Sequence, residues 1–188
     1  MLIALFFDIF FSFVHNTNGD FMFYYLNMFI IGSVLGFIME LCLKTFVFTS
    51  MNSSILYGPW LPVYGFGICL SIFLQRLIFN RLKVNKIVKI IVLFLLIMLV
   101  STIAEWIGGM FIELVFDKTF WDYRDLRFNI GKYIALEVSI IWGILSLLFL
   151  YIIKPQLDKV IKKVPKIITI LVLSAMIVDF IATLMIKA

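Results

Sequence analysis

Five carboxylate side chains lie in the most apolar stretches of this 188-residue chain. Insertion scales put the cost of an ionised acid at the centre of a membrane helix at about 2.5–3.5 kcal/mol. Because five together would strongly oppose insertion, we expect them to face one another, water or a partner rather than lipid. Such acids could bind a cation or an amine, or titrate during transport. They are Glu40, Glu105, Glu113, Glu137 and Asp179.

The composition indicates an integral membrane protein. Hydrophobic residues make up 64% of the chain and charged residues only 14%, whereas soluble domains have about 25% charged residues. The net charge of +5 comes from basic residues in short segments between apolar runs, which favours membrane topology over nucleic-acid binding. The sequence has no glycine-rich phosphate loop, so any energy from ATP would have to come from a partner.

Five apolar runs are long enough to cross a bilayer, which needs about 20 residues. The predicted fold is therefore all-α, a bundle of about five transmembrane helices forming a single domain over residues 21–188. A shorter run, Leu2–Val14, predicts an interfacial or partial span within residues 1–20, with a sixth span as the alternative. The five runs are Phe21–Phe46, Pro62–Phe79, Ile90–Phe116, Tyr133–Ile153 and Ile167–Ile186.

The basic segments predict the orientation of these spans. Gln75–Lys89 contains five basic residues and no acid, and Lys154–Lys166 contains five lysines and one acid. The positive-inside rule places both in the cytoplasm, so Val47–Leu61 and Asp117–Lys132 face outward. All five acids then fall toward the outer half of the membrane.

Helical spacing predicts that the acids lie inside the bundle. Gly32, Gly36 and Glu40 are four residues apart, and small residues at this spacing let helices approach closely. This face could serve internal packing or a homodimer. Glu105, Gly109 and Glu113 have the same spacing, so we expect both acids to face a polar, outward-opening pocket. The alternative is close packing, with each acid bonded to Tyr, Trp or Arg.

The two outward segments add polar and aromatic groups. The stretch YGPWLPVYGFG, residues 57–67, is rich enough in Gly and Pro to predict an irregular re-entrant or capping element instead of a regular helix. The stretch FWDYRDLRFNIGKY, residues 120–133, places donors and acceptors above the acids. Arg124 or Arg127 could neutralise a membrane glutamate.

The basic segment Lys154–Lys166 predicts a short cytoplasmic amphipathic helix. Leu157, Val160, Ile161 and Val164 form one apolar stripe, with lysines elsewhere. This helix could anchor the chain at the inner leaflet or form a docking surface for a cytoplasmic partner. Cys42, Cys69 and the single His15 have no metal-ligand spacing, so the sequence predicts no metal site and no cofactor.

Four stretches in a fixed order resemble a known family. GSVLGFIME is followed by YGPWLPVYGFG, by a glutamate-bearing span and by WDYRDLRFNIGKYIALEVSIIWG. Together they resemble the putative ABC-transporter type IV permease family, over about Phe21 to Pro155. Family features carry onto Glu40, Gly58, Pro59, Pro62, Tyr64, Gly65, Glu105, Glu113, Trp121, Asp122, Tyr123, Asn129, Gly131 and Trp142.

The resemblance implies a membrane component of an ATP-driven transporter, multi-pass in a bacterial cytoplasmic membrane, and names no substrate. A cytoplasmic ATPase would dock at Arg76–Lys89 and Lys154–Lys166, and a chain of this size would dimerise to enclose a pathway. No residue is expected to be catalytic. The binding or transport candidates are the five acids with Tyr57, Gly58, Pro59, Tyr64, Gly65, Trp121, Asp122, Tyr123, Arg124 and Asn129.

Two other functions remain open on sequence grounds. Two carboxylates in a low-dielectric site can divide into an acid and a base, so Glu105 with Glu40 or Glu113 could serve an enzyme acting on a lipid-linked substrate. No nucleophile motif accompanies them. Alternatively, the polar cluster only fixes helix packing in a non-catalytic assembly or regulatory protein.

Overall fold

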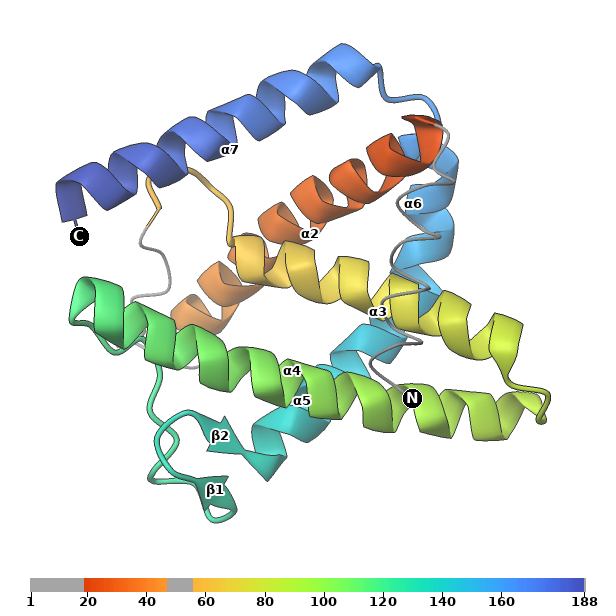
Figure 1. Cartoon of the computed structure of the whole chain (residues 1–188), viewed down its shortest axis with the longest axis horizontal. Coiled ribbons are helices and arrows are strands. Elements are labelled where there is room, and N and C mark those ends of the chain that lie inside the picture. The colour runs from red at the N-terminus through yellow and green to blue at the C-terminus, as the bar shows by residue number, and fades with distance from the viewer. Residues whose placement is uncertain (1–18, 47–55, 188) are drawn as a thin grey trace.

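The computed structural model describes residues 19–46 and 56–187 (Figure 1). Five helical segments in this part are long and apolar enough to cross a membrane, so the predicted all-α membrane fold is confirmed. The segment Leu2–Val14 and His15 lie outside the described residues. The helices are α2 (Gly19–Phe46), α3 (Pro62–Arg81), α4 (Lys86–Phe116), α5 (Leu136–Leu148) with its continuation, and α7 (Lys166–Lys187).

The continuation of α5 is the predicted amphipathic segment. A π-helical turn, η1 (Phe149–Ile153), joins α5 directly to α6 (Lys154–Ile161), so these form one helical stretch. The predicted apolar stripe is shorter than expected, because the helix ends before Val164, while Leu157 and Ile161 pack against the core. In Figure 1, α6 leads the chain toward the N-terminal end of α2.

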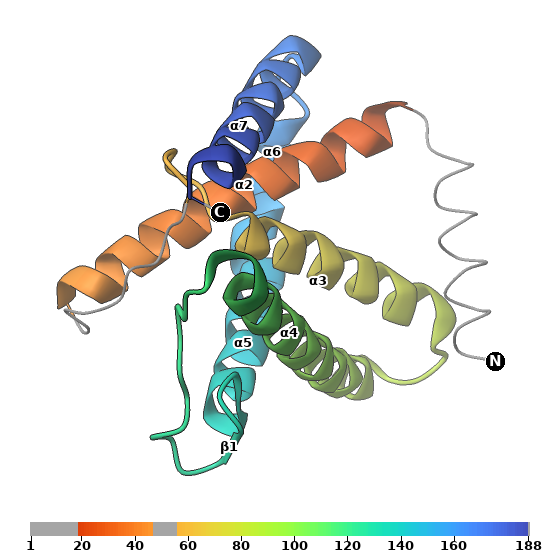
Figure 2. The ribbon, with the colours of Figure 1, turned by 60° about the vertical axis from the view of Figure 1, so that its left-hand side comes forward.

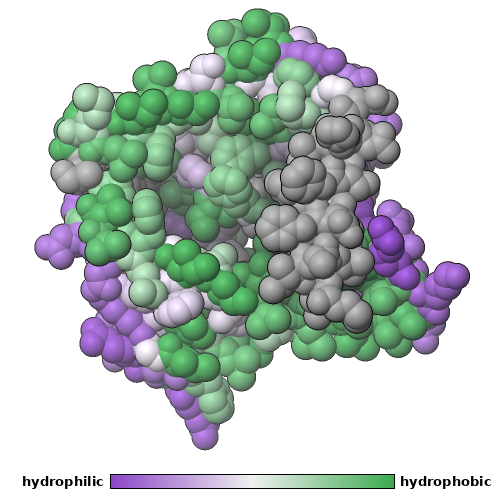
Figure 3. Space-filling model, in the orientation of Figure 1, coloured by the Kyte–Doolittle hydropathy of each residue, from purple (hydrophilic) through white to green (hydrophobic). Residues whose placement is uncertain are grey.

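The helices pack by crossing one another. α2 crosses α3, α4 crosses α5, and α2 also contacts α7 (Figures 1 and 2). Apolar side chains cover most of the face in Figure 3, and hydrophilic ones gather at its left and right edges, which are the two ends of the bundle. This distribution fits a bundle whose sides contact lipid and whose ends contact water.

Glycines set the closest helix contacts. A Cβ on Gly32 would lie 2.8 Å from Ile68 Cδ1, and one on Gly36 would lie 2.2 Å from Tyr64 Cγ. The Gly32/Gly36 face is therefore occupied by α3 of the same chain, which answers the choice between internal packing and dimerisation in favour of packing. Gly65 of α3 lies in turn against the backbone of Phe29.

The Gly/Pro-rich stretch is only half irregular. Residues 56–61 are non-helical, but α3 begins at Pro62, so the expectation of an irregular chain up to residue 67 was wrong. Proline is favoured in a first helical turn, because the amide hydrogen that it lacks would have no partner there. Gly65 and Gly67 sit within the regular helix, where Gly65 allows the contact with α2.

Residues 117–135, here called the strap, contain a small β-hairpin that the sequence did not predict. Strands β1 (Asn129–Ile130) and β2 (Ile134–Ala135) are antiparallel. Gly131 in the turn has φ +69°, a conformation that glycine adopts without steric cost. Asp117 ends α4 in the left-handed region, at φ 50°. The strap then returns along the end of α4 to reach α5.

We predict that Gly36→Ala destabilises the bundle by about 1–3 kcal/mol, the range for an overpacked core position. The added methyl group would overlap the Tyr64 side chain at 2.2 Å, so α2 and α3 must separate. Thermal unfolding in one detergent would measure the loss. Gly67→Ala is the matched control, because nothing lies within 4 Å of its Cβ position. Equal melting temperatures for the two variants would contradict this account of α2–α3 packing.

Candidate functional site

The five acids all lie at one end of the bundle, here called the acid end. Each meets either the start of α3, the residues just before it, or the strap, which connect helices at this end. The placement of the acids in the outer half of the membrane stays a prediction. Their surroundings differ, however, and those differences separate a candidate site from its scaffold.

Glu40 and Tyr64 form the contact between α2 and α3. The Tyr64 hydroxyl donates to Glu40 Oε1 at 2.7 Å. Gly36, one helical turn before Glu40, leaves the space in which the Tyr64 ring lies on α2. The ring also meets Trp142 of α5 edge to face, with centroids 5.4 Å apart. An acid of α2 is therefore held beside two aromatic rings from other helices.

Glu105 of α4 lies in the same group of side chains. Its Oε1 accepts a hydrogen bond from the Tyr123 hydroxyl at 3.0 Å. Its Oε2 and the indole nitrogen of Trp142 are both buried, and neither has a hydrogen-bond partner among the described residues. The indole N–H of Trp142 interacts with the Glu105 carboxylate at the edge of hydrogen-bonding geometry, so no full hydrogen bond joins them. One buried acceptor and one buried donor thus remain unused side by side.

We call Glu40, Tyr64, Glu105, Tyr123 and Trp142 the carboxylate–aromatic cluster. Glu105 and Tyr123 lie within electrostatic range of Tyr64, and Glu40 lies within range of Tyr123. Burial, followed by the nearby carboxylates, raises the pKa of Tyr123 well above its usual range, so its hydroxyl stays a neutral donor. The cluster draws on α2, α3, α4, α5 and the strap. Two carboxylates among three aromatic rings can receive a positively charged group.

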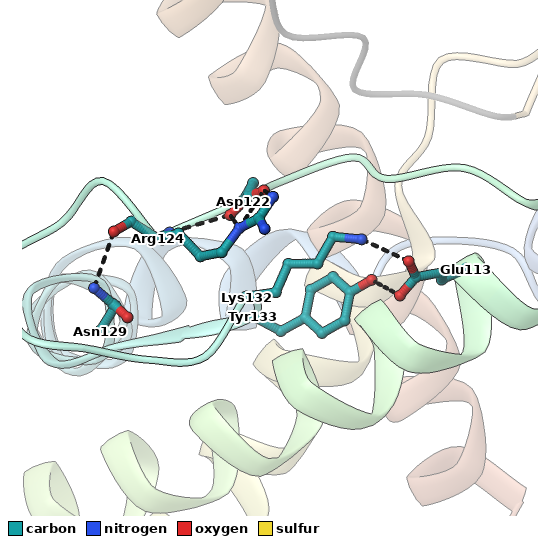
Figure 4. A network of polar contacts seen from close by, with 6 residues as sticks. All are labelled: Glu113, Asp122, Arg124, Asn129, Lys132 and Tyr133. Atoms are coloured by element: carbon teal, nitrogen blue, oxygen red, sulfur yellow. Dashed lines mark hydrogen bonds and ion pairs between the residues drawn. The ribbon is translucent and has the colours of Figure 1, made fainter.

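Glu113 lies outside this cluster, so the expected shared pocket with Glu105 is not formed. Its Oε1 pairs with Lys132 Nζ at 2.6 Å, and its Oε2 accepts from the Tyr133 hydroxyl (Figure 4). The Glu113 side chain is 47% exposed. The cation paired with Glu113 is therefore Lys132. Of the two arginines considered for this role, Arg124 acts on Glu113 only at longer range, and Arg127 lies against the Phe128 ring.

Asp122, Arg124 and Asn129 stabilise the strap itself. Arg124 pairs with Asp122 at 2.5 Å on the surface, and this guanidinium holds the pKa of Asp122 at about 2 (Figure 4). The Asn129 amide donates to the carbonyl oxygens of Arg124 and Leu126. The strap therefore uses these polar side chains to close its own turns.

Aromatic packing holds the strap on α4. The rings of Trp121 and Tyr133 meet with centroids 6.1 Å apart. Tyr133 lies over Gly109, where a Cβ would come within 2.4 Å of its ring. The predicted free space beside Gly109 is thus filled by an aromatic ring of the same chain.

The carboxylates of Glu137 and Asp179 accept hydrogen bonds from backbone amides. Glu137 Oε1 accepts from the Phe128 amide at 3.1 Å, which ties the hairpin to the first turn of α5. Asp179 of α7 accepts from the amides of Tyr57 and Gly58, at 3.0 and 2.9 Å, and from the Trp60 indole at 2.7 Å. Asp179 thereby anchors residues 57–60 to α7.

Of the remaining candidates, Tyr57 and Pro59 are exposed, and Gly58 and Gly65 allow close contacts with Trp60 and with α2. Glu40, Tyr64, Glu105 and Tyr123 are thus the predicted site residues that meet in the cluster. Trp142 was identified only as a family feature, and Lys132, Tyr133 and Trp60 were not among the candidates. Within the described residues, no group of three His, Cys, Asp or Glu could hold a metal ion.

The opposite end, here called the basic end, carries the predicted docking segments. Arg76 lies over the rings of Phe21, Tyr24 and Tyr25, with its guanidinium carbon 5.1–5.4 Å from each centroid. Lys154 pairs with Asp158 at 2.6 Å. Arg76 therefore links α3 to α2, whereas the Lys154–Asp158 pair lies within α6. Other basic side chains are exposed, namely Arg81, Lys83, Lys86, Lys159, Lys162 and Lys163.

Comparison with known proteins connects this geometry to a family. Residues 27–186 match the family described as Putative ABC-transporter type IV. The chain belongs to this family. The match includes all five acids, the strap and the whole carboxylate–aromatic cluster, and it reaches further toward the C-terminus than the motifs in the sequence indicated. No curated protein and no solved structure matches this chain.

The contact of Glu113 with Lys132 and Tyr133 predicts a pH dependence in this ABC-transporter family member. The hydrogen bond to Glu113 raises the pKa of Lys132. Burial, together with the Glu113 carboxylate, raises the pKa of Tyr133. A group whose pKa is raised in the folded protein contributes its full stabilisation below its ordinary pKa, which is 10.5 for Lys132 and 10.0 for Tyr133. This stabilisation is lost as the pH rises through the pKa of the folded state. Glu113→Gln should therefore melt below the wild-type protein at neutral pH.

The melting difference should stay constant to about pH 9 and shrink above about pH 10, as Tyr and Lys lose their protons. Thermal unfolding of both proteins across this range measures it, and the subtraction cancels the other titrating groups. Asp125→Asn, which removes an exposed carboxylate from the same strap, should give a difference that does not shrink in this way. A Glu113→Gln difference that is unchanged beyond the ordinary pKa values of both groups would argue against the assigned contacts.

Proposed function

We propose that this protein is a permease or substrate-binding membrane subunit of an ABC-type transporter, and that its carboxylate–aromatic cluster binds a cationic group of the substrate. The observation that carries the proposal is that the buried Oε2 of Glu105 and the buried indole N–H of Trp142 lie close together without a full hydrogen bond. A buried acceptor without a partner costs about 1–3 kcal/mol, and more when it is charged. A bound ligand would recover that cost.

The side chains around Glu105 favour a protonated amine, which combines a positive charge with N–H donors. Aromatic faces attract cations, and the attraction grows when both are removed from water. An ammonium donor would satisfy Glu105 Oε2, and a neighbouring oxygen of the same molecule would accept from Trp142. A small rotation could instead pair these two atoms directly, so the ligand would replace that pair. Tyr123, which reaches Glu105 from the strap, would cover the bound group.

The charge distribution supports the orientation and the partner. By the positive-inside rule, the exposed lysines and arginines place the basic end in the cytoplasm and the cluster on the outer side. The family suggests an ATPase partner, and the sequence offers no phosphate loop of its own. The exposed Lys159 lies in the last turn of α6, which Tyr24 ties to the bundle, and Lys162 and Lys163 follow this helix. These three lysines form the docking surface in this proposal.

A second candidate function rests on the other three acids. Glu113, Glu137 and Asp179 each bind groups of the same chain, as residues that only fix helix and loop packing would do. A non-catalytic assembly or regulatory role needs no more than this. The response of Glu105 to a ligand separates the two candidates, because the assembly role needs no ligand at this carboxylate.

We predict that methylammonium chloride, whose cation carries N–H donors, raises the melting temperature of the purified protein above that in NaCl of equal concentration. A ligand at 100 times its Kd adds about 2.7 kcal/mol to stability when it binds only the folded state. Glu105→Gln keeps the side-chain size and should abolish the rise. Glu113→Gln, the same change outside the cluster, should retain it. No rise in the wild-type protein, or an equal rise in Glu105→Gln, would contradict a cation site at Glu105.

A second prediction tests the transporter role apart from the site. Purification from native membranes in mild detergent, followed by mass spectrometry, should recover an ATPase subunit in near-stoichiometric amount. Changing Lys159, Lys162 and Lys163 together to Gln should release it, because these cations are exposed at the basic end. Lys118→Gln/Arg127→Gln removes exposed cations from the acid end and should have no effect. Recovery of no ATPase would favour the assembly role.

A further inference from the structure

We propose that the β-hairpin of the strap is inserted into the lipid headgroup interface at the acid end, through an apolar surface formed by Phe128, Ile130 and Leu136. We call this surface the hairpin foot. Its side chains are 54%, 74% and 47% exposed. The proposal concerns a surface remote from the substrate, and it stands whether or not the carboxylate–aromatic cluster binds a cation.

The hairpin has two different faces. Ile130 pairs with Ile134, and the Leu136 amide donates to the Phe128 carbonyl at 3.0 Å, which continues the same register. Side chains alternate between the faces of a strand. Tyr133 and Ala135 on one face are buried, with Tyr133 against Gly109 of α4. The hairpin foot lies on the other face, which α4 does not cover.

Contacts along α4 give the depth of the hairpin in the membrane. Thr102 and Ser139 are joined by a 2.6 Å hydrogen bond, so the start of α5 lies beside α4 well before α4 ends at Phe116. Tyr133 reaches Gly109 and Glu113. The hairpin therefore lies alongside the last turns of α4 and does not extend beyond them.

The length of α4 shows where the hairpin lies relative to the hydrocarbon layer of the bilayer. Starting from Lys89, the hydrocarbon layer of about 30 Å takes about 20 residues at 1.5 Å each and ends close to Gly109. The Tyr133 ring, which packs on Gly109, is thus at the boundary between hydrocarbon and headgroups. The hairpin foot belongs to the same small hairpin and lies at this boundary too.

The surroundings of the hairpin foot favour lipid over water as its occupant. Leu136 begins α5, whose exposed side chains Ile140, Ile141 and Ile144 continue the apolar surface along the predicted span. The Arg127 guanidinium lies 5.3 Å from the Phe128 ring centroid, and Arg127 is exposed. An aromatic ring with an adjacent arginine suits the interface, where the ring meets acyl chains and the cation meets phosphate.

Insertion at this level would hold the strap in place from the lipid side. The strap carries Tyr123 to Glu105 and Lys132 to Glu113, so both contacts depend on its position over α4. Glu137 links the hairpin to α5 through the Phe128 amide. The membrane therefore becomes one of the surfaces against which the strap is packed, alongside α4 and α5.

Site-specific quenching tests this proposal. Cys42 and Cys69 are replaced by Ala, and Ile130→Cys is labelled with the fluorophore NBD in the full chain, reconstituted into phospholipid nanodiscs. Phospholipid carrying a doxyl group near the headgroup quenches a probe in the interface, and aqueous iodide quenches a probe in water. Ile141→Cys is the lipid-facing reference. Lys118→Cys, just beyond the end of α4, is the water-facing reference.

We expect the Ile130 probe to lose most of its emission to doxyl lipid, as the Ile141 probe does, and little to iodide. Strong iodide quenching at the level of Lys118 would overturn the proposal, because the hairpin foot would then face water. Protection from both quenchers would also overturn it, since protein, for example a second copy of this chain, would then cover the surface. Phe128→Cys is a second labelling position if the Ile130 variant does not purify as a single species.

Discussion

The structure depends on one constraint, which is that an acid on an apolar helix must be solvated by protein. Four of the five acids meet this constraint through non-helical chain. Glu105, Glu113 and Glu137 take hydrogen bonds from the strap, and Asp179 takes three from residues 57–60. Glu40 is bonded by Tyr64 in the first turn of α3. The acids therefore determine how the connecting segments fold back onto the acid end of the bundle.

The five acids differ in how many of their oxygens accept a hydrogen bond, and this difference sets Glu105 apart from the rest of the acid end. Asp179 accepts from two amides and an indole, and Glu113 uses both oxygens. Glu105 uses one oxygen, and the buried Trp142 indole beside it also lacks a partner among the described residues. Glu137 likewise leaves Oε2 unused within that part of the chain, but its other oxygen binds backbone. At Glu105 the unsatisfied acceptor lies beside the indole donor of Trp142 and among aromatic rings.

The sequence predicted the helices well because their cause is local. Apolar length defined five spans, and the alternation of basic and mixed segments placed the acids at a common end. The four-residue spacing of Gly32, Gly36 and Glu40 indicated a contact face, which the structure assigns to α3. Those features follow from period and composition alone. The domain boundaries at residues 20 and 21 remain a prediction.

The partners of the acids were harder to predict, because partner choice depends on the path of the strap. Lys132 rather than Arg124 reaches Glu113, since the hairpin turn at Gly131 directs Lys132 back toward α4. Arg124 is instead held by Asp122, two residues away. Residue type cannot separate an arginine from a lysine as the neutralising cation. The strands β1 and β2 are also too short for an alternating pattern of side chains to be recognised in the sequence.

The basic end shows that α2 links both polar ends of the molecule. Near its start, the Tyr24 hydroxyl donates to Asp158 of α6 at 2.8 Å, and Asn27 accepts from Thr169 of α7 at 2.9 Å. Near its other end, Glu40 accepts from Tyr64 in the carboxylate–aromatic cluster. Backbone hydrogen bonds keep a helix stiff along its axis, so α2 can transmit a shift of α6 toward Glu40. Tyr24 connects α2 to α6 in two ways, because its hydroxyl bonds Asp158 and its ring centroid lies 5.9 Å from Lys154 Nζ.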